Sequence, residues 1–124
     1  MPEGLQCEYV DGILVQTFTD SNDAAVAAWA AILDDAMAQS TPDIPFRVLV
    51  DVSAKQVSFT RAARQHTTIL FTRHRQQPGR IAFFFSSRTA PYFSRIFFAS
   101  LGKLAFELNH FSSPEKAIEW LKLP

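Results

Sequence analysis

The stretch Phe46-Arg47-Val48-Leu49-Val50-Asp51-Val52 decides the fold, because its apolar residues follow one another almost without interruption. A strand inside a parallel sheet is covered on both faces and shows such a run, whereas a half-exposed strand alternates apolar and polar residues. We therefore predict a central parallel strand here. Arg80-Ile81-Ala82-Phe83-Phe84-Phe85 has the same character and predicts a second buried strand.

Two amphipathic segments precede and follow the first run. One helix is expected after the capping candidates Asp20, Ser21 and Asn22. Its apolar face consists of Val26, Trp29, Ala30, Leu33 and Met37. A second helix is expected from Thr60 to about His74. Its apolar stripe consists of Phe59, Ala63, His66 and Leu70.

Two further helices are expected towards the end of the chain. One runs from about Pro91 to Leu101, and its inner stripe consists of Phe93, Ile96, Phe97 and Leu101. The other follows the cap Ser113 with Pro114 at its first position, a place where proline is favoured. Its inward-pointing residues are Ala117, Ile118 and Leu121.

Strands complete the pattern at both ends. Leu5–Val10 and Ile13–Thr19 flank the turn dipeptide Asp11-Gly12 and predict a hairpin. A last strand is expected over Lys103–Phe111. The order is then ββαβαβαβα, which predicts an α/β fold with a mixed, mostly parallel five-stranded sheet covered by helices, in a single domain over residues 1–124.

Composition places the chain among globular proteins of a reducing compartment. Hydrophobic residues make up 48% and charged residues 19%, which disagrees with disorder. Cys7 is the single cysteine and predicts neither a disulfide nor a zinc site. The start of the chain lacks a secretory signal, and the longest apolar stretch, residues 24–33, is too short to span a membrane. We expect a soluble, cytoplasmic protein.

Charge is distributed unevenly although the net charge is zero. Residues 1–51 carry nine acidic residues against one basic residue, and residues 52–106 carry nine basic residues and no acidic residue. The basic residues of the second stretch are Lys55, Arg61, Arg64, Arg73, Arg75, Arg80, Arg88, Arg95 and Lys103. Either the two halves cancel each other in the fold or across a dimer, or the second half forms a face that attracts anions.

Three segments carry a resemblance to a known family. They are Arg47–Asp51, Arg80–Ala82 with the helix that follows, and the ending Phe111–Leu121. The chain resembles the STAS-like proteins related to the bacterial SpoIIAA anti-sigma-factor antagonists, and within them the SpoIIAA-like proteins. The resemblance covers nearly the whole chain by the order of its elements. It implies a non-enzymatic regulatory module that binds a partner protein or a small ligand.

One departure from that family concerns phosphorylation. Phosphorylated members resemble Asp-Leu-Ser followed by Asp-Ser-Ser-Gly, and Asp51-Val52-Ser53 fits the first part only. The later stretch, residues 58–62, lacks the acid and the serine pair. A phosphate on Ser58 or Thr60 would still lie at a helix N-terminus, which favours negative charge. The alternative is that these hydroxyl groups only cap the helix.

A ligand site is expected where the parallel strands end, because helix N-termini point outward there. Two loops at that edge supply hydroxyl groups, cations and free amides, which hold phosphates or carboxylates. The candidate residues are Lys55, Ser58, Thr60, Arg61, Ser86, Ser87, Arg88 and Tyr92. Ordinary helix capping and surface charge are the alternative explanation.

Metal and catalytic interpretations find little support. His66 and His74 would lie about 80° apart around a helix, so they would not bind the same metal ion. His66 fits a core or interface position, and His110 has no ligand partner nearby in sequence. The sequence has neither a Gly-x-Ser-x-Gly elbow nor a phosphate-binding Gly-rich loop. We predict no catalytic residue, no metal and no cofactor.

Twelve phenylalanines are many for this length. Either they fill a sheet that is covered on both faces, or some remain outside the core and form a homodimer interface or an apolar pocket. The leading hypothesis is a regulatory protein-interaction module, for which we expect a shallow apolar patch and no deep cavity. The rival is a binder of a small anionic or amphipathic ligand, with a pocket near Lys55, Arg88 and Tyr92. Nucleic-acid binding is not expected, because the basic stretch is balanced by an acidic one.

Overall fold

The computed structural model describes residues 2–86 and 90–124, and the side chains of 2–86 and 94–124. Its strands are β1 (Leu5–Val10), β2 (Ile13–Phe18), β3 (Phe46–Asp51), β4 (Gly79–Phe84) and β5 (Glu107–Phe111). Its helices are α1 (Asp23–Ala38), α2 (Arg61–Arg73), α3 (Ala90–Ala99) and α4 (Pro114–Lys122). The predicted order ββαβαβαβα is confirmed.

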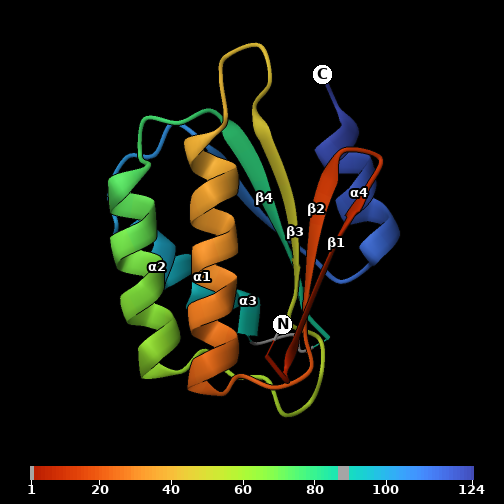
Figure 1. Ribbon diagram of the computed structural model, residues 1–124, viewed down its shortest axis with the longest axis vertical. Coiled ribbons are helices and arrows are strands. Elements are labelled where there is room, and N and C mark those ends of the chain that lie inside the picture. Colours follow the sequence, from red (N-terminus) through yellow and green to blue (C-terminus); the bar gives the residue numbers. More distant parts are fainter. Residues whose placement is uncertain (1, 87–89) are drawn as a thin grey trace.

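The five strands form one sheet in the order β1-β2-β3-β4-β5. β1 pairs antiparallel with β2, and every other neighbouring pair is parallel. β3 is therefore the middle strand, as its apolar run predicted. Helices α1, α2 and α3 cover one face and α4 covers the other (Figure 1).

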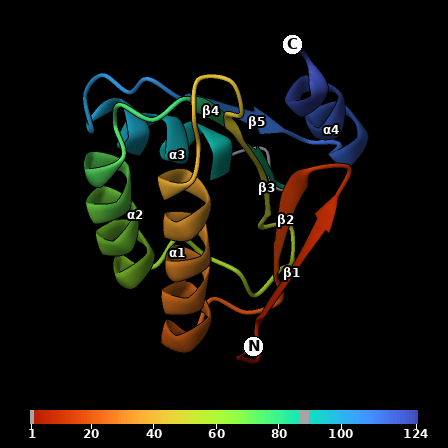
Figure 2. The same ribbon diagram turned by 45° about the horizontal axis from the view of Figure 1, so that its top comes forward.

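Two apolar layers separate the sheet from its helices. The larger one lies under α1, α2 and α3, with Trp29, Leu33, Val48 and Phe71 among its buried members. The smaller one lies under α4 and joins Ile13, Leu49 and Ala82 to Ala117 and Leu121. Figure 2 shows the first three helices side by side and α4 alone on the opposite face.

Local sequence signals set the element boundaries. The β1–β2 turn places Asp11 at φ 52° and Gly12 at φ 79°, the left-handed pair that a tight hairpin turn requires. Asn22 caps α1, since its side chain accepts a hydrogen bond from the Ala25 amide at 2.9 Å. Thr60 caps α2 in the same way, through the Ala63 amide. Ser113 caps α4.

The predicted apolar stripe of α2 was partly wrong. The helix buries Ala63, Thr67, Leu70 and Phe71, whereas His66 is only half-buried. Phe59 precedes the helix and is 41% exposed. The inner face thus lies about one residue further round the helix than the sequence pattern indicated.

The predicted stripe of α3 was also wrong in part. Ile96 is 57% exposed, while Ser94 and Phe98 are buried. Phe97 and Leu101 pack against the core as partly buried residues, and the side chain of Phe93 lies outside the described residues. The last strand begins at Glu107 rather than Lys103.

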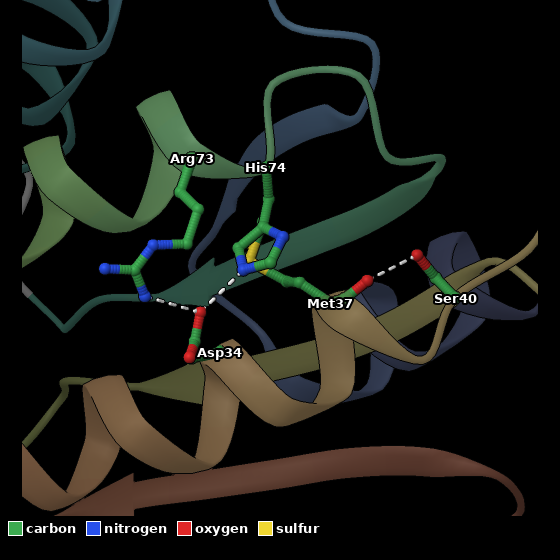
Figure 3. A network of polar contacts seen from close by, with 5 residues as sticks. All are labelled: Asp34, Met37, Ser40, Arg73 and His74. Carbon is green, nitrogen blue, oxygen red and sulfur yellow. Dashed lines mark hydrogen bonds and ion pairs between the residues drawn. The ribbon is translucent and has the colours of Figure 1, made fainter.

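A polar contact joins the C-terminal ends of α1 and α2 (Figure 3). Asp34 Oδ1 lies 2.6 Å from His74 Nε2 and 3.1 Å from Arg73 Nη1. These hydrogen bonds, that with His74 first, lower the pKa of Asp34 despite the opposing effect of burial. Ser40 donates a hydrogen bond to the Met37 carbonyl and ends α1 nearby. One acid of the first half of the chain therefore neutralises a base of the second half.

Candidate ligand cavity

A cavity of about 600 Å³ opens where β2, β3 and β4 end, between the sheet and the three helices on its larger face. The lining comes from Phe18, Ser21, Val26, Trp29, Val50, Val52, Ala54, Lys55, Val57, Ser58, Phe59, Ala63, Thr67, Phe83, Phe85, Ser86, Ser94 and Phe98. Figure 1 shows the β2–α1 and β3–α2 loops together at this end of the sheet. The cavity thus occupies the edge at which ligands bind in open α/β sheets.

Aromatic rings form much of the wall. Phe83 stacks on Phe98 with ring centres 5.2 Å apart, which joins β4 to α3. Trp29 lies against Phe18 at 6.1 Å. Phe59 meets Phe97 edge-to-face at 5.0 Å and closes the wall between the β3–α2 loop and α3. The wall is therefore apolar and ordered by ring contacts between different elements.

The hydroxyl groups of Thr67, Ser86 and Ser21 on the wall are engaged within the protein. Thr67 Oγ1 donates to the Ala63 carbonyl at 2.6 Å. Ser86 Oγ donates to the Ser53 carbonyl at 2.8 Å, and Ser21 Oγ accepts from the Ser58 amide at 3.1 Å. These three hydroxyl groups are therefore satisfied, whereas the buried Trp29 Nε1 on the same lining has no partner among the described residues. The wall suits a mainly apolar occupant that can accept one hydrogen bond from the indole.

Lys55 is the one charged residue on the described lining, and it is exposed. Ser58 and Ser86 lie on the lining with it. A long lysine side chain can keep its ammonium group in water while its stem covers apolar surface. The cavity therefore combines an apolar interior with a cation on its lining.

Ser94 contacts His110 across this wall, but the pair is not arranged for nucleophilic catalysis. Ser94 Oγ lies 3.0 Å from His110 Nε2, and Arg95 Nε donates towards His110 Nδ1 at 3.5 Å. A donor at Nδ1 leaves the ring proton on Nε2, so the histidine donates to the serine instead of removing its proton. Burial, and then the charge of Arg95, lower the pKa of His110 to about 4. A histidine with so low a pKa is a weak base for activating a serine.

The structure brings only some of the predicted ligand residues to the cavity. Lys55, Ser58 and Ser86 line it. Thr60 is engaged as the cap of α2, and Arg61 is exposed at the first position of that helix, off the lining. The remaining candidates, Ser87, Arg88 and the side chain of Tyr92, lie outside the described residues. Phosphorylation of Ser58 or Thr60 stays a prediction.

Sequence reasoning missed most of the wall. Trp29, Phe83 and Phe98 were assigned to the core or left without a role, yet they line the cavity. His110 was not connected with Ser94, because sixteen residues separate them. The apolar character of the three aromatic residues was visible in the sequence. A cavity between three helices and a sheet, however, leaves no local signal in the sequence.

Other parts of the described chain offer less. A second hollow of about 720 Å³ lies beside residues 2–7, Thr19 and Asp20, and its described lining carries acids and no cation. Over residues 2–86 and 90–124, His, Cys, Asp and Glu side chains do not gather in threes within reach of one metal ion. None of the helices described has the length and apolar character needed to cross a bilayer.

Comparison with known proteins finds similarity in structure. No protein-family model and no curated protein matches the sequence. The chain is similar to the crystal structure of an uncharacterized protein of the DUF3478 family from Shewanella loihica PV-4, which is described as having a SpoIIAA-like fold. The TM-score is 0.66 at 16% identity, and the match covers 94% of this chain and 91% of the other. The resemblance seen in the sequence is confirmed at the level of architecture: this chain has a SpoIIAA-like fold.

Proposed function

We propose that the protein binds a small amphipathic molecule, with an apolar body inside the cavity and one anionic group beside Lys55. The observation that carries this proposal is the cavity itself, whose volume of about 600 Å³ lies in the range of small-molecule sites. Its aromatic wall suits an apolar body, and Trp29 Nε1, which is unpartnered within the described chain, could donate one hydrogen bond to it.

The position of the charge gives the ligand its expected orientation. Lys55 is exposed and lines the cavity together with Ser58, so a carboxylate or phosphate near them would stay partly hydrated. Burying the rest of the ligand would contribute about 0.8 kcal/mol for each methylene group removed from water. Affinity should therefore come from the body, and the head group should set selectivity.

The fold supports a second candidate, a non-enzymatic regulatory module of STAS-like type that binds a partner protein. For that hypothesis we expected a shallow apolar patch and no deep cavity, and this expectation is wrong. The partner, the regulatory role and the predicted homodimer stay proposals. The exposed side chains of Tyr9 and Ile44 are available to such contacts.

Binding can be followed with the chain's own fluorescence. Trp29 lines the cavity, whereas Trp120 belongs to α4 on the other face of the sheet and packs against Phe111 of β5. In a Trp120→Phe background, dodecanoate should change the Trp29 emission saturably. Lys55→Gln should weaken dodecanoate binding about three- to tenfold, as expected for a partly exposed ion pair, and should leave dodecanol binding unchanged.

Lys103→Gln is the matched control, because it removes one exposed cation away from the described lining. Ala54→Phe, which places a ring at the cavity wall, should reduce the binding of both ligands. Emission that shows no saturable response to either ligand would refute the proposal. Equal dodecanoate affinity in Lys55→Gln and in the parent protein would refute the role of the anionic group.

A further inference from the structure

The cavity rim carries an exposed ring among cations. Phe59 lines the cavity and is 41% exposed, although it is a large apolar side chain. Four residues before it, Lys55 is exposed on the same lining. Arg61 and Arg64 follow in the first turn of α2 and are both exposed. We call residues 55–64 the rim segment.

Arg64 is held next to the exposed ring. Its Nη1 atom donates to the carbonyl oxygen of Phe59 at 2.9 Å, so the guanidinium group stays beside that residue. Within the described residues, neither Arg61 nor Arg64 has a carboxylate within 4.0 Å. Residues 52–106 contain no acidic residue at all. The rim segment therefore keeps its positive charge.

Acidic residues lie next to the rim segment and offset part of its charge. Ser21 accepts a hydrogen bond from the Ser58 amide within that segment, and its neighbours Asp20 and Asp23 are exposed. The cations Lys55, Arg61 and Arg64 outnumber these two acids, so an anionic partner would still be attracted to the rim segment.

We propose that the rim segment docks on an anionic lipid surface. A phenylalanine flanked by lysine and arginine is the combination that binds a bilayer interface, because the ring enters the head-group region while the cations meet lipid phosphates and carboxylates. The cavity opens at the same place, so docking would bring its mouth to a source of amphipathic molecules. That last step rests on the proposed function; the docking itself does not.

A nucleic acid would also attract these cations, but the rim fits it less well. The chain is neutral overall, and the acids Asp20 and Asp23 lie next to the rim segment. Nucleic-acid sites follow a phosphate backbone with a longer basic stripe. A lipid surface would accommodate the exposed part of the Phe59 ring, whereas a charged duplex would not.

Cosedimentation with vesicles tests the docking. The parent protein should bind vesicles of phosphatidylcholine and phosphatidylserine, mixed two to one, at least about tenfold more strongly than pure phosphatidylcholine vesicles. Raising the salt should weaken binding. Arg61→Gln/Arg64→Gln should reduce binding about tenfold or more, and Phe59→Ser should reduce it while Phe59→Leu preserves it.

Arg75→Gln/Lys103→Gln is the control, because it removes the same charge at the other end of these helices, where Arg75 contacts the Leu101 carbonyl. Urea unfolding of each variant verifies the fold. Equal binding to both vesicle types, or equal losses in the two double variants, would overturn the proposal. Tighter binding of a duplex oligonucleotide that depends on Arg61 and Arg64 would overturn it in favour of nucleic acid.

The two proposals fail separately. Protein that binds dodecanoate but does not sediment with anionic vesicles refutes the docking and leaves the cavity function intact. Protein that sediments with vesicles but shows no Trp29 response to dodecanoate refutes the cavity function only.

Discussion

Ser94 Oγ lies 3.0 Å from His110 Nε2, which joins α3 to β5 at the cavity wall. The imidazole ring stacks on Phe83 and Phe85 at 5.8 Å and 5.6 Å between ring centres. These rings exclude water from the histidine, and Arg95 adds a positive charge beside it. Both effects disfavour the protonated ring, so the histidine is neutral at physiological pH.

This neutral histidine makes stability depend on pH. Its folded pKa is about 4, against 6.5 for an unperturbed histidine. Between these values the unfolded chain holds a proton that the folded chain lacks, so stability is complete above pH 6.5 and decreases as the pH falls to 4. After allowance for partial exposure, we expect a loss of about 1 to 2 kcal/mol in urea unfolding.

His110→Gln provides the comparison, because glutamine can still donate to Ser94 but does not titrate. The difference in unfolding free energy between the parent and this variant should shrink by about 1 to 2 kcal/mol from pH 7 to pH 4. A constant difference over this range would contradict the lowered pKa.

Because Asp34 contacts His74 and Arg73, we expect the protein to lose stability when this carboxylate is replaced by a neutral group. Asp34→Asn should lower the unfolding free energy by about 1 kcal/mol near neutral pH, a modest value because the carboxylate is partly exposed. Since its pKa is lowered, this stability is present above the unfolded pKa and disappears in stronger acid, as the pH falls through the folded value. Asp35→Asn, at an exposed neighbouring position, should change stability by less than about 0.5 kcal/mol.

Gly79 is required by close packing. A Cβ atom at this position would lie 2.3 Å from the ring of Phe46, which is itself buried. Gly79→Ala should therefore cost about 2 to 3 kcal/mol, and less in a Phe46→Leu background, because leucine leaves room for the methyl group. Equal costs in the two backgrounds would exclude the clash with the ring.

Gly12→Ala tests a different cause. A Cβ atom there would meet nothing within 4 Å, but the residue has φ +79°. Backbone strain alone should cost about 1 kcal/mol. In thermal unfolding, Gly79→Ala, which creates a steric overlap, should therefore lose more stability than Gly12→Ala, which creates only backbone strain.

The elements that sequence predicted well are those specified locally. The Asp11-Gly12 turn, the Asn22, Thr60 and Ser113 caps and the apolar run of β3 each need only neighbouring residues. The inner face of α3 needed tertiary information, because Ile96, Phe97 and Phe98 are all apolar and periodicity does not choose between adjacent stripes. Phe106 is buried although it precedes β5, because it packs edge-to-face on Phe46 and Phe71.

The sequence predicted where the candidate site lies but not that its wall is apolar. The rule that ligands bind where parallel strands end pointed to Lys55, Ser58 and Ser86, which line the cavity. The apolar wall depends on how far α3 stands from the sheet, which the sequence does not specify. The hydroxyl groups of Thr60 and Ser86, which were predicted as ligand donors, instead bond to the Ala63 amide and the Ser53 carbonyl.

Arg80 fixes the C-terminal end of α4 and yields the last prediction. Its Nη1 atom donates to the Trp120 and Leu123 carbonyls, its Nε atom contacts Glu107, and its guanidinium lies 5.6 Å from the centre of the Trp120 ring. Lysine offers one compact charge in place of this planar set of donors. Arg80→Lys should therefore cost about 1 to 2 kcal/mol and speed amide exchange in α4 but not in α1. Arg47→Lys, at the paired position on β3, is the control and should leave amide exchange in α4 unchanged. Equally faster exchange in both variants would mean that the contacts of Arg80 do not hold the end of α4.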